Sequence, residues 1–375
     1  MTWLIYLQLG LYGYVLYGIG ASIQLLRDEQ DVSRTVSGLH GTALAVGALL
    51  AGFTGARLVH RFGRGHALWG GLATAVVGAG LFCSSTWLGL TLTGAFVATF
   101  GGSLVVNSSS TALADHHGNL GTSAVSEANA MAAGVGTLAP LAVGAAAAAG
   151  IGWRAGLLAS AALLALVAAT FRGIRVPDHR SAGDPHPATG SLPGRYWWAW
   201  AVILLCVAVE FSMTIWTPDI LESRVGFSKG AAAAGVTAIV AGMAAGRLIG
   251  GHLARTIPVD RLLFTALGTS AVGFVVFWAT TSPVPALVGL VISGLGISLH
   301  FPLGIMRAIG AAGGRRDLAA ARASLAVGIA VGVGPFVLGA LADGVGTHRA
   351  FLIVPGLLVL AALCVLRSPS RVATG

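Results

Sequence analysis

Long apolar segments alternate with short polar ones along the whole chain. A helix needs about 20 mostly apolar residues to cross the hydrocarbon core of a bilayer. The first half offers such segments at 3–26, 36–59, 67–84, 88–112, 125–149 and 155–172. The second half offers them at 198–221, 231–254, 262–279, 283–307, 320–344 and 350–367. The pattern predicts an all-α membrane protein of twelve transmembrane helices, with a turn at Ser84–Thr86 between the third and the fourth.

A polar segment separates the two sets of helices. It covers 173–196, carries Asp178 and Asp184, and is rich in proline. This composition is typical of a linker and not of a helix. We therefore expect a six-helix bundle at 1–172, a linker at 173–196 and a second six-helix bundle at 197–375.

Composition excludes a soluble domain. Only 9% of the residues are charged and 55% are hydrophobic, whereas a soluble domain carries about 25% charged residues. The lipid bilayer is therefore the expected surrounding. A net charge of +9 would suggest nucleic-acid binding in a soluble protein. Here the charges lie almost entirely in short connecting segments, so membrane topology explains them and no nucleic-acid partner is expected.

Lys and Arg are concentrated in every second connecting segment. Six of them lie in the alternate segments: Arg27, Arg34, Arg154, Arg224, Lys229 and Arg349. Cytoplasmic loops carry such an excess of positive charge. The sequence predicts a protein of the cell inner membrane with both termini and the linker in the cytoplasm. Asp219 and Asp343 fall at the opposite helix ends, where we expect them to be solvated.

The two halves align without gaps at a constant spacing of 195 residues. Three matches are less easily dismissed as chance than those of Gly, Ala and Leu: Trp3 with Trp198, Pro140 with Pro335, and Arg154 with Arg349. Six helices per half give both halves the same orientation. Parallel six-helix repeats with a binding site between them near the membrane midplane are an architecture of secondary transporters.

Cofactor and enzyme chemistry have no sequence signature here. Cys83, Cys206 and Cys364 lie in apolar runs without CxxC spacing, which is typical of packed core residues. The chain contains no P-loop, no HExxH, no GxSxG and no Cys/His ligand set. We expect no metal, no cofactor and no enzymatic activity, and ATP is not expected to drive the protein directly.

The segment 55–68, GARLVHRFGRGHAL, resembles the signature loop of the major facilitator superfamily, G-x-L-a-D-r-x-G-r-r-x-x-L. Five positions fit: Leu58, Arg61, Gly63, Arg64 and Leu68. His60 stands where the family has Asp, a residue that helps to latch helices together. The resemblance implies a monomer that works by alternating access, with helices 1, 4, 7 and 10 lining a central cavity.

Glu210 is the best candidate for proton coupling. It lies near the middle of the predicted helix 198–221, and a charge at that depth is costly enough to suggest a function. Desolvation favours its protonated form, so Glu210 is expected to carry a proton or to bind a cationic substrate. Helical spacing adds four neighbours to the candidate substrate cavity: Met213, Thr214, Thr217 and Trp216.

His300 is a second proton-coupling candidate, in the segment 283–307, because histidine titrates near neutral pH. Helix 88–112 offers one polar face to the cavity: Ser103, Asn107 and Ser110. The spacing of 195 maps this polar face onto Ser298, Pro302 and Ile305, which lie roughly opposite His300 on its helix. Either the two halves differ in rotation, or only one of the two sets faces the cavity. Tyr6 and Tyr17 on the first helix complete the candidate cavity, because tyrosine both stacks and hydrogen-bonds.

Gating residues are expected near the cytoplasmic side. They are the loop arginines Arg61 and Arg64, Arg247 within a helix, and Glu127 with its repeat mate Arg322. A salt bridge between Glu127 and Arg322 that breaks as the halves rock is an attractive hypothesis.

The leading functional prediction is proton-coupled efflux of a small organic solute. Segment 134–144 resembles the glycine–proline motif of exporters, with Ala139 replacing the glycine before Pro140. Exporters also place an arginine in helix 4, where this chain has Val97. Proton-coupled uptake of a metabolite therefore stays open as an alternative. A non-transporting sensor or an intramembrane enzyme is a further alternative, which the gapless repeat argues against.

Overall fold

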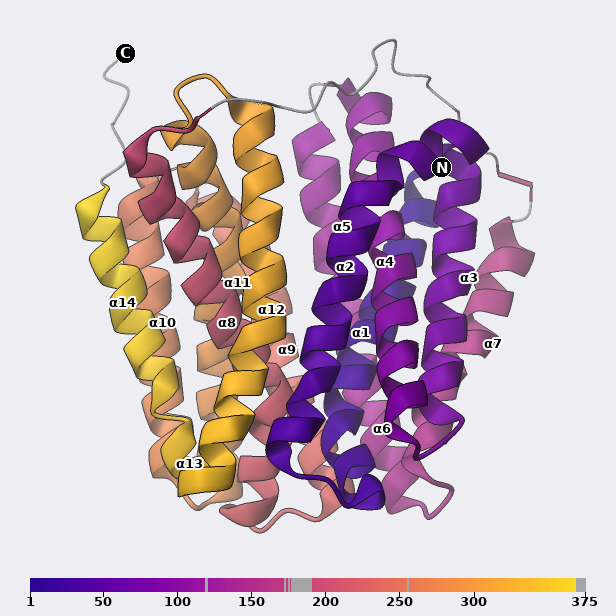
Figure 1. Cartoon of the computed structure of the whole chain (residues 1–375), viewed down its shortest axis with the longest axis vertical. Helices are drawn as coiled ribbons and strands as arrows, with labels where there is room; N and C mark the ends of the chain where they lie inside the picture. Colours follow the sequence, from indigo (N-terminus) through magenta and orange to yellow (C-terminus); the bar gives the residue numbers. More distant parts are fainter. Residues whose placement is uncertain (119–120, 172, 175, 177–190, 255, 369–375) are drawn as a thin grey trace.

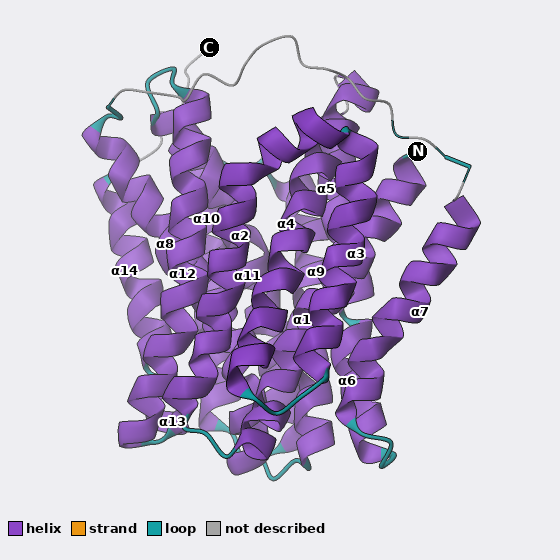
Figure 2. Cartoon of the chain, turned by 45° about the vertical axis from the view of Figure 1, so that its right-hand side comes forward, coloured by secondary structure: helices purple, strands orange, loops and turns teal. Residues whose placement is uncertain are grey.

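The structure is a computed structural model that describes residues 1–118, 121–171, 173–174, 176, 191–254 and 256–368. These residues form helices and loops without a strand (Figure 2). The first half contains α1 (Thr2–Gln30), α2 (Arg34–Phe62), α3 (Arg64–Cys83), α4 (Leu88–His117), α5 (Gly121–Gly136), α6 (Leu138–Ala148) and α7 (Trp153–Phe171). The second half contains α8 (Gly194–Ser223), α9 (Lys229–Leu253), α10 (Val259–Ala279), α11 (Pro283–Ala311), α12 (Arg316–Val345), α13 (Thr347–Ala350) and α14 (Ile353–Arg367).

Within the described residues, 12 spans are long and apolar enough to cross a membrane, which confirms the predicted number. Helices α5 and α6 form one span, and α13 and α14 form another. The predicted turn between the third and fourth helices is also confirmed, because α3 ends at Cys83 and α4 begins at Leu88. The predicted linker 173–196 lies largely outside the described residues.

The internal repeat is visible in where the helices begin. Four helices of the first half and their counterparts in the second start 195 residues apart: α2 and α9, α3 and α10, α4 and α11, and α5 and α12. The local cause is repeated as well. Ser33 caps α2 by accepting a hydrogen bond from Val36 N, and Ser228 caps α9 by accepting one from Ala231 N.

Helix packing within each half depends on glycines that repeat at the same spacing. A Cβ added to Gly47 of α2 would lie 2.3 Å from the carbonyl oxygen of Phe96 on α4. A Cβ added to Gly242 of α9 would lie 2.2 Å from the carbonyl oxygen of Val291 on α11. Three further glycine pairs make repeated close contacts: Gly78 and Gly273, Gly94 and Gly289, and Gly101 and Gly296. Small residues let membrane helices approach this closely.

The two halves stand side by side, and both chain termini lie at one end of the molecule (Figure 1). We call this the linker end, because α7 ends and α8 begins there, and the opposite end the far end. The halves meet where α2 packs on α12 and where α5 and α6 pack on α9. These two interfaces are related by the repeat: a Cβ on Gly144 would meet Gly230 O at 2.4 Å, and one on Gly339 would meet Arg34 O at 2.6 Å.

Pro140 interrupts the fifth span. Because proline has no N–H, it cannot bond to the carbonyl one turn earlier, and the helix breaks between α5 and α6 at Thr137. The carbonyl oxygen of Thr137 accepts a hydrogen bond of 3.2 Å from the hydroxyl of Thr237 on α9. Pro140 leaves the carbonyl of Gly136 without its helical donor, and the donor from the other half bonds to the next carbonyl along the chain.

The same arrangement recurs 195 residues later. Pro335 lies inside α12, and the carbonyl oxygen of Gly332, three residues before it, accepts a hydrogen bond of 2.8 Å from Thr42 on α2. Thr42 and Thr237 are repeat mates, and so are Thr137 and Gly332. Two equivalent hydrogen bonds thus join the halves at their two proline-containing helices.

The far end is held shut by ion pairs that centre on Asp219 of α8. This side chain is buried, in contrast to the solvated position expected from the sequence. It accepts from Arg27 of α1 at 2.5 Å and from Arg34 of α2 at 3.2 Å, and Thr347 also donates to it. Since both arginines belong to the first half, Asp219 ties the two halves together.

Two further contacts close the far end. The carboxylate of Asp343 on α12 accepts from the backbone N–H groups of Arg34 at 3.0 Å and Thr35 at 2.8 Å, and so caps α2 from the other half. Lys229 of α9 forms an ion pair with Asp28 of α1. The sequence predicts only that the side chain of Asp343 is solvated. In the structure its carboxylate also binds the first backbone N–H groups of α2.

Gly47→Ala is expected to destabilise the protein by about 1–3 kcal/mol, because the added methyl group meets a backbone oxygen that cannot move aside. Gly52→Ala, on the same helix, is the control: nothing lies within 4 Å of its Cβ. The measurement is the thermal unfolding midpoint of the protein in detergent. Equal midpoints for the two variants would contradict the packing described.

Asp219→Asn is expected to open the far end, because removing one partner of a buried ion pair costs about 3–5 kcal/mol. Gly20→Cys supplies the reporter: its Cβ has open space around it, and the native cysteines are buried. The measurement is the rate at which an impermeant maleimide labels this cysteine from the far side. The rate should rise with Asp219→Asn and stay unchanged with Asp31→Asn, an exposed aspartate at the same end.

Candidate functional site

A small pocket of about 30 Å³ lies between the halves. Its walls come from α1 and α2 of the first half and from α8 and α9 of the second. They are mostly apolar: Leu16, Tyr17, Gly20, Leu44, Glu210, Phe211, Thr214, Ile215 and Val236. A concave, largely apolar site with few polar groups is the usual form of a small-molecule site.

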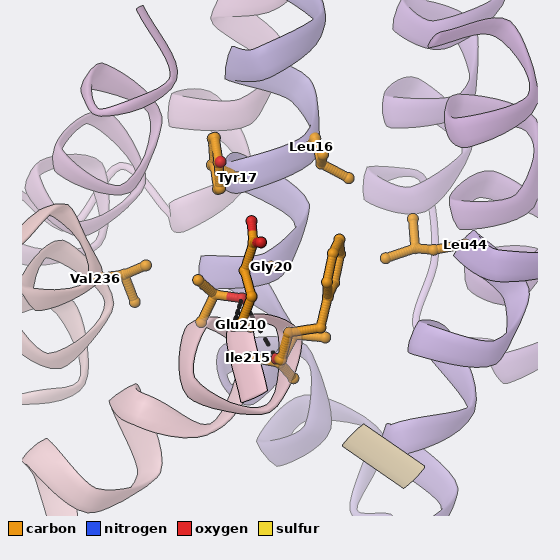
Figure 3. Close-up of a pocket in the computed structure, with 9 residues that line it drawn as sticks. Leu16, Tyr17, Gly20, Leu44, Glu210, Ile215 and Val236 are labelled. Atoms are coloured by element: carbon orange, nitrogen blue, oxygen red, sulfur yellow. Dashed lines mark hydrogen bonds between the residues drawn. The ribbon is translucent and has the colours of Figure 1, made fainter. Parts of the chain in front are cut away.

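Glu210 is the acidic residue of this pocket. Its carboxyl group rises from α8 into the pocket toward Tyr17 of α1 (Figure 3). Among the described residues, no hydrogen bond or ion pair within 4.0 Å reaches this carboxyl group. The sequence-based candidate is thus in the pocket, with its acidic group free to hold a proton or a ligand.

Helix direction brings two more polar groups to the level of Glu210. Side chains tilt toward the N-terminus of their own helix. Helices α1 and α8 begin at the linker end, so the side chains of Tyr17 and Glu210 tilt toward that end. Helix α9 runs in the opposite direction and ends at the linker end, so the side chain of Arg247 tilts away from that end, toward the pocket. Arg247 interacts with the hydroxyl of Tyr17 and, at longer range, with Glu210.

Arg247 also reaches the first half. Its guanidinium donates to the carbonyl oxygen of Asn129 on α5 at 3.4 Å. The sequence analysis assigned Arg247 to gating. The structure places it beside the pocket, between both halves, so a role in binding is equally open to it.

Tyr12 is a polar neighbour that the sequence analysis left out. Its hydroxyl interacts with Ser103 of α4, and its ring lies where a Cβ of Gly102 would be. The signal in the sequence was Gly102, which leaves room for a ring. Further along α4 toward the linker end, Asn107 is exposed and Ser110 is half-buried, its hydroxyl bonded to the carbonyl of its own helix.

Only one of the four neighbours proposed for Glu210 on α8 lines the pocket. This is Thr214. Met213 and Thr217 are fully buried elsewhere on α8. Trp216 turns away and donates its indole N–H to the carbonyl oxygen of Pro335 on α12 at 2.9 Å. The structure therefore does not bring these three to the pocket.

His300 is also away from the pocket. It is fully buried between α10 and α11, and its Nε2 lies 3.1 Å from the hydroxyl oxygen of Ser270. Ser298, two residues earlier on α11, faces Gly246 of α9 instead. Of the two α11 faces left open by the sequence, His300 lies on the one directed into the second half.

The candidate gating residues occupy the linker end. Tyr6 donates to Glu127 at 2.8 Å, which joins α1 to α5 within the first half. Arg322 of α12 is exposed, and its carbonyl accepts from Trp200. Arg61 is exposed too, with its guanidinium 5.2 Å from the ring centre of Phe62.

Arg64 is buried at the start of α3 and pairs with Asp115 near the end of α4 at 2.8 Å. The second half has the same contact with the charges exchanged: Asp260 at the start of α10 pairs with Arg307 near the end of α11. Each pair joins two helices of one half. Both therefore stabilise a half without connecting it to the other.

Residues 5–306 and 225–374 match the Major Facilitator Superfamily, and the chain belongs to this family. It is therefore a membrane transport protein and not an enzyme, as predicted. No curated protein sequence matches the chain.

Solved structures share the fold. A bacterial homologue of the human lysosomal transporter Spinster, inward-facing and occupied, is 16% identical with a TM-score of 0.79, over 98% of this chain and 96% of that one. The xylose transporter XylE from E. coli, inward open, is 14% identical with a TM-score of 0.80, over 100% and 96%. A D-xylose–proton symporter is 15% identical with a TM-score of 0.75, over 96% and 95%.

His300→Gln is expected to lower stability without changing proton coupling, because the imidazole contacts Ser270 and not the pocket. Losing a buried hydrogen bond of this kind costs about 1–3 kcal/mol. The thermal unfolding midpoint and the pH profile of transport are the two measurements. A changed pH profile with an unchanged midpoint would return His300 to the proton-coupling site.

Proposed function

We propose that this protein is a proton-coupled secondary transporter that moves a small organic solute by alternating access, with Glu210 as the proton carrier. The observation that carries the proposal is the position of Glu210: an acidic group without a direct partner among the residues that the structure describes, in a pocket between the two halves. A carboxyl group at this depth is stable when it is protonated or when a cation faces it.

The state of the two interfaces supports alternating access. Among the described residues, ion pairs join the two halves at the far end, whereas the pairs Arg64–Asp115 and Asp260–Arg307 at the linker end each lie within one half. We propose that the linker end is cytoplasmic, in the inner membrane, as the excess of arginine there predicts. The structure would then be the inward-facing state of a monomer.

Two versions of proton coupling differ in direction. The sequence-based prediction is efflux, in which the solute leaves as a proton enters. In cotransport, the solute and the proton move together. Arg247 favours cotransport: it balances the charge of an ionised Glu210, so that protonation of Glu210 makes the site more attractive to an anion.

The test uses membrane vesicles of both orientations with an imposed proton gradient and a pH-sensitive dye. A panel of anionic, neutral and cationic solutes is added in turn. We expect at least one solute to change the gradient, and Glu210→Gln to reduce this change to the level of vesicles without the protein, because glutamine cannot exchange a proton.

Glu222→Gln is the matched control, because Glu222 lies on the same helix at the far end and accepts from Gln24. It should leave proton movement intact. If Glu210→Gln transports with an unchanged proton stoichiometry, Glu210 is not the proton carrier. The vesicle orientation in which the solute accumulates decides between efflux and cotransport.

A further inference from the structure

Glu210 gives the pocket a negative pole, and Arg247, which lies behind the pocket wall, interacts with the hydroxyl of Tyr17 in that wall and forms a positive pole. Three ionisable groups interact with Glu210: Arg247 on α9, Tyr17 on α1 and the thiol of Cys206 on α8 itself. Two other ionisable side chains on neighbouring helices face elsewhere: Arg322 lies near Tyr196, and His300 lies on Ser270. Within the described part of the chain, Arg247 is therefore the cation that balances Glu210.

The two poles do not touch. No contact of 4.0 Å or less joins Glu210 and Arg247, so a polar group of a ligand can stand between them. Arg247 holds the carbonyl oxygen of Asn129 at 3.4 Å, which is a long hydrogen bond. A guanidinium has five donors in a planar fork that matches the oxygens of a carboxylate or sulfonate.

Charge balance decides which ligand fits. With Glu210 ionised, the pair is neutral and the pocket has no net charge to offer. When Glu210 takes up a proton, Arg247 stays charged and lacks a counterion at membrane depth, which is costly. An anion that binds Arg247 restores neutrality, so a proton and an anion each favour the binding of the other.

We propose that the substrate is a small organic monoanion with an apolar body, and that Arg247, with the hydroxyl of Tyr17, binds its anionic group. The apolar walls accept the body, because they consist of aliphatic and aromatic side chains: Leu16, Leu44, Phe211, Ile215 and Val236. The inference rests on the proposed function, since it assigns the proton that accompanies the anion to Glu210.

The test measures binding to the purified full-length protein in lipid nanodiscs, without a proton gradient. Three probes share one aromatic ring: benzenesulfonate, which stays anionic at every pH used, benzyl alcohol, and benzyltrimethylammonium. Ligand binding raises the thermal unfolding midpoint in proportion to affinity. We expect benzenesulfonate to stabilise the protein most, and its affinity to rise as the pH falls from 8 to 6.

Three variants make the test specific. Arg247→Gln should weaken benzenesulfonate binding about 10- to 100-fold, the loss expected for hydrogen bonds to a charged group. Arg247→Lys keeps the charge without the planar fork and should bind with intermediate affinity. Glu210→Gln leaves Arg247 permanently unbalanced, so it should bind benzenesulfonate with an affinity that no longer depends on pH.

Arg349→Gln, which removes an exposed arginine at the far end, is the control and should bind like the native protein. The inference is wrong if benzyltrimethylammonium stabilises the protein more than benzenesulfonate does, if no probe stabilises it, or if Arg247→Gln and Arg247→Lys bind like the native protein. The two proposals fail separately. Loss of the Arg247 dependence overturns only the anion site, whereas proton movement that survives Glu210→Gln in vesicles overturns the proton carrier.

Discussion

Two hydrogen bonds from threonine hydroxyls to backbone carbonyls, each beside a proline, join the two halves inside the hydrocarbon layer, where protein groups must supply the hydrogen-bond partners. Pro140 and Pro335 each leave the carbonyl four residues earlier, that of Gly136 or Val331, without its helical donor. In both cases a threonine of the opposite half, Thr237 or Thr42, donates to the carbonyl next to that one. The weakest point of each interface helix is thus also a point of contact between the halves. Because the two contacts are repeat mates, they form a symmetric pair, and in the proposed alternating access the halves would rotate about them.

The charged side chains are arranged in two ways that match such a rotation. At the far end, Asp219 draws Arg27 and Arg34 across the boundary between the halves. At the linker end, the pairs Arg64–Asp115 and Asp260–Arg307 act within one half. In the proposed mechanism the far-end pairs would break for the halves to separate there, whereas each linker-end pair joins two helices of one half. The packed glycines add to this rigidity, since their helices touch through backbone atoms.

Sequence reasoning predicted the number of helices, the repeat and the pocket position of Glu210, because these follow from hydropathy and from the cost of a charge in lipid. It misplaced Trp216 and left the orientation of His300 open, because helical spacing shows which residues share a face but not which neighbour that face meets. Arg247 shows a second reason. Because α9 runs opposite to α1 and α8, the side chain of Arg247 tilts toward the far end and interacts with Tyr17 in the pocket wall.

The opposite charges of Glu210 and Arg247 also give a reason, in the proposed scheme, why the movement of a proton would be coupled to the movement of an anion. In the proposed scheme the site is neutral when it is empty and neutral again when it holds both a proton and an anion. Either ligand alone leaves one uncompensated charge, and such a charge is costly where water is scarce. The halves can therefore rotate about their threonine contacts at comparable cost in the two neutral states, and at higher cost in the two half-loaded ones. Coupling then needs no further gate, because the electrostatic cost itself suppresses movement of one ligand without the other.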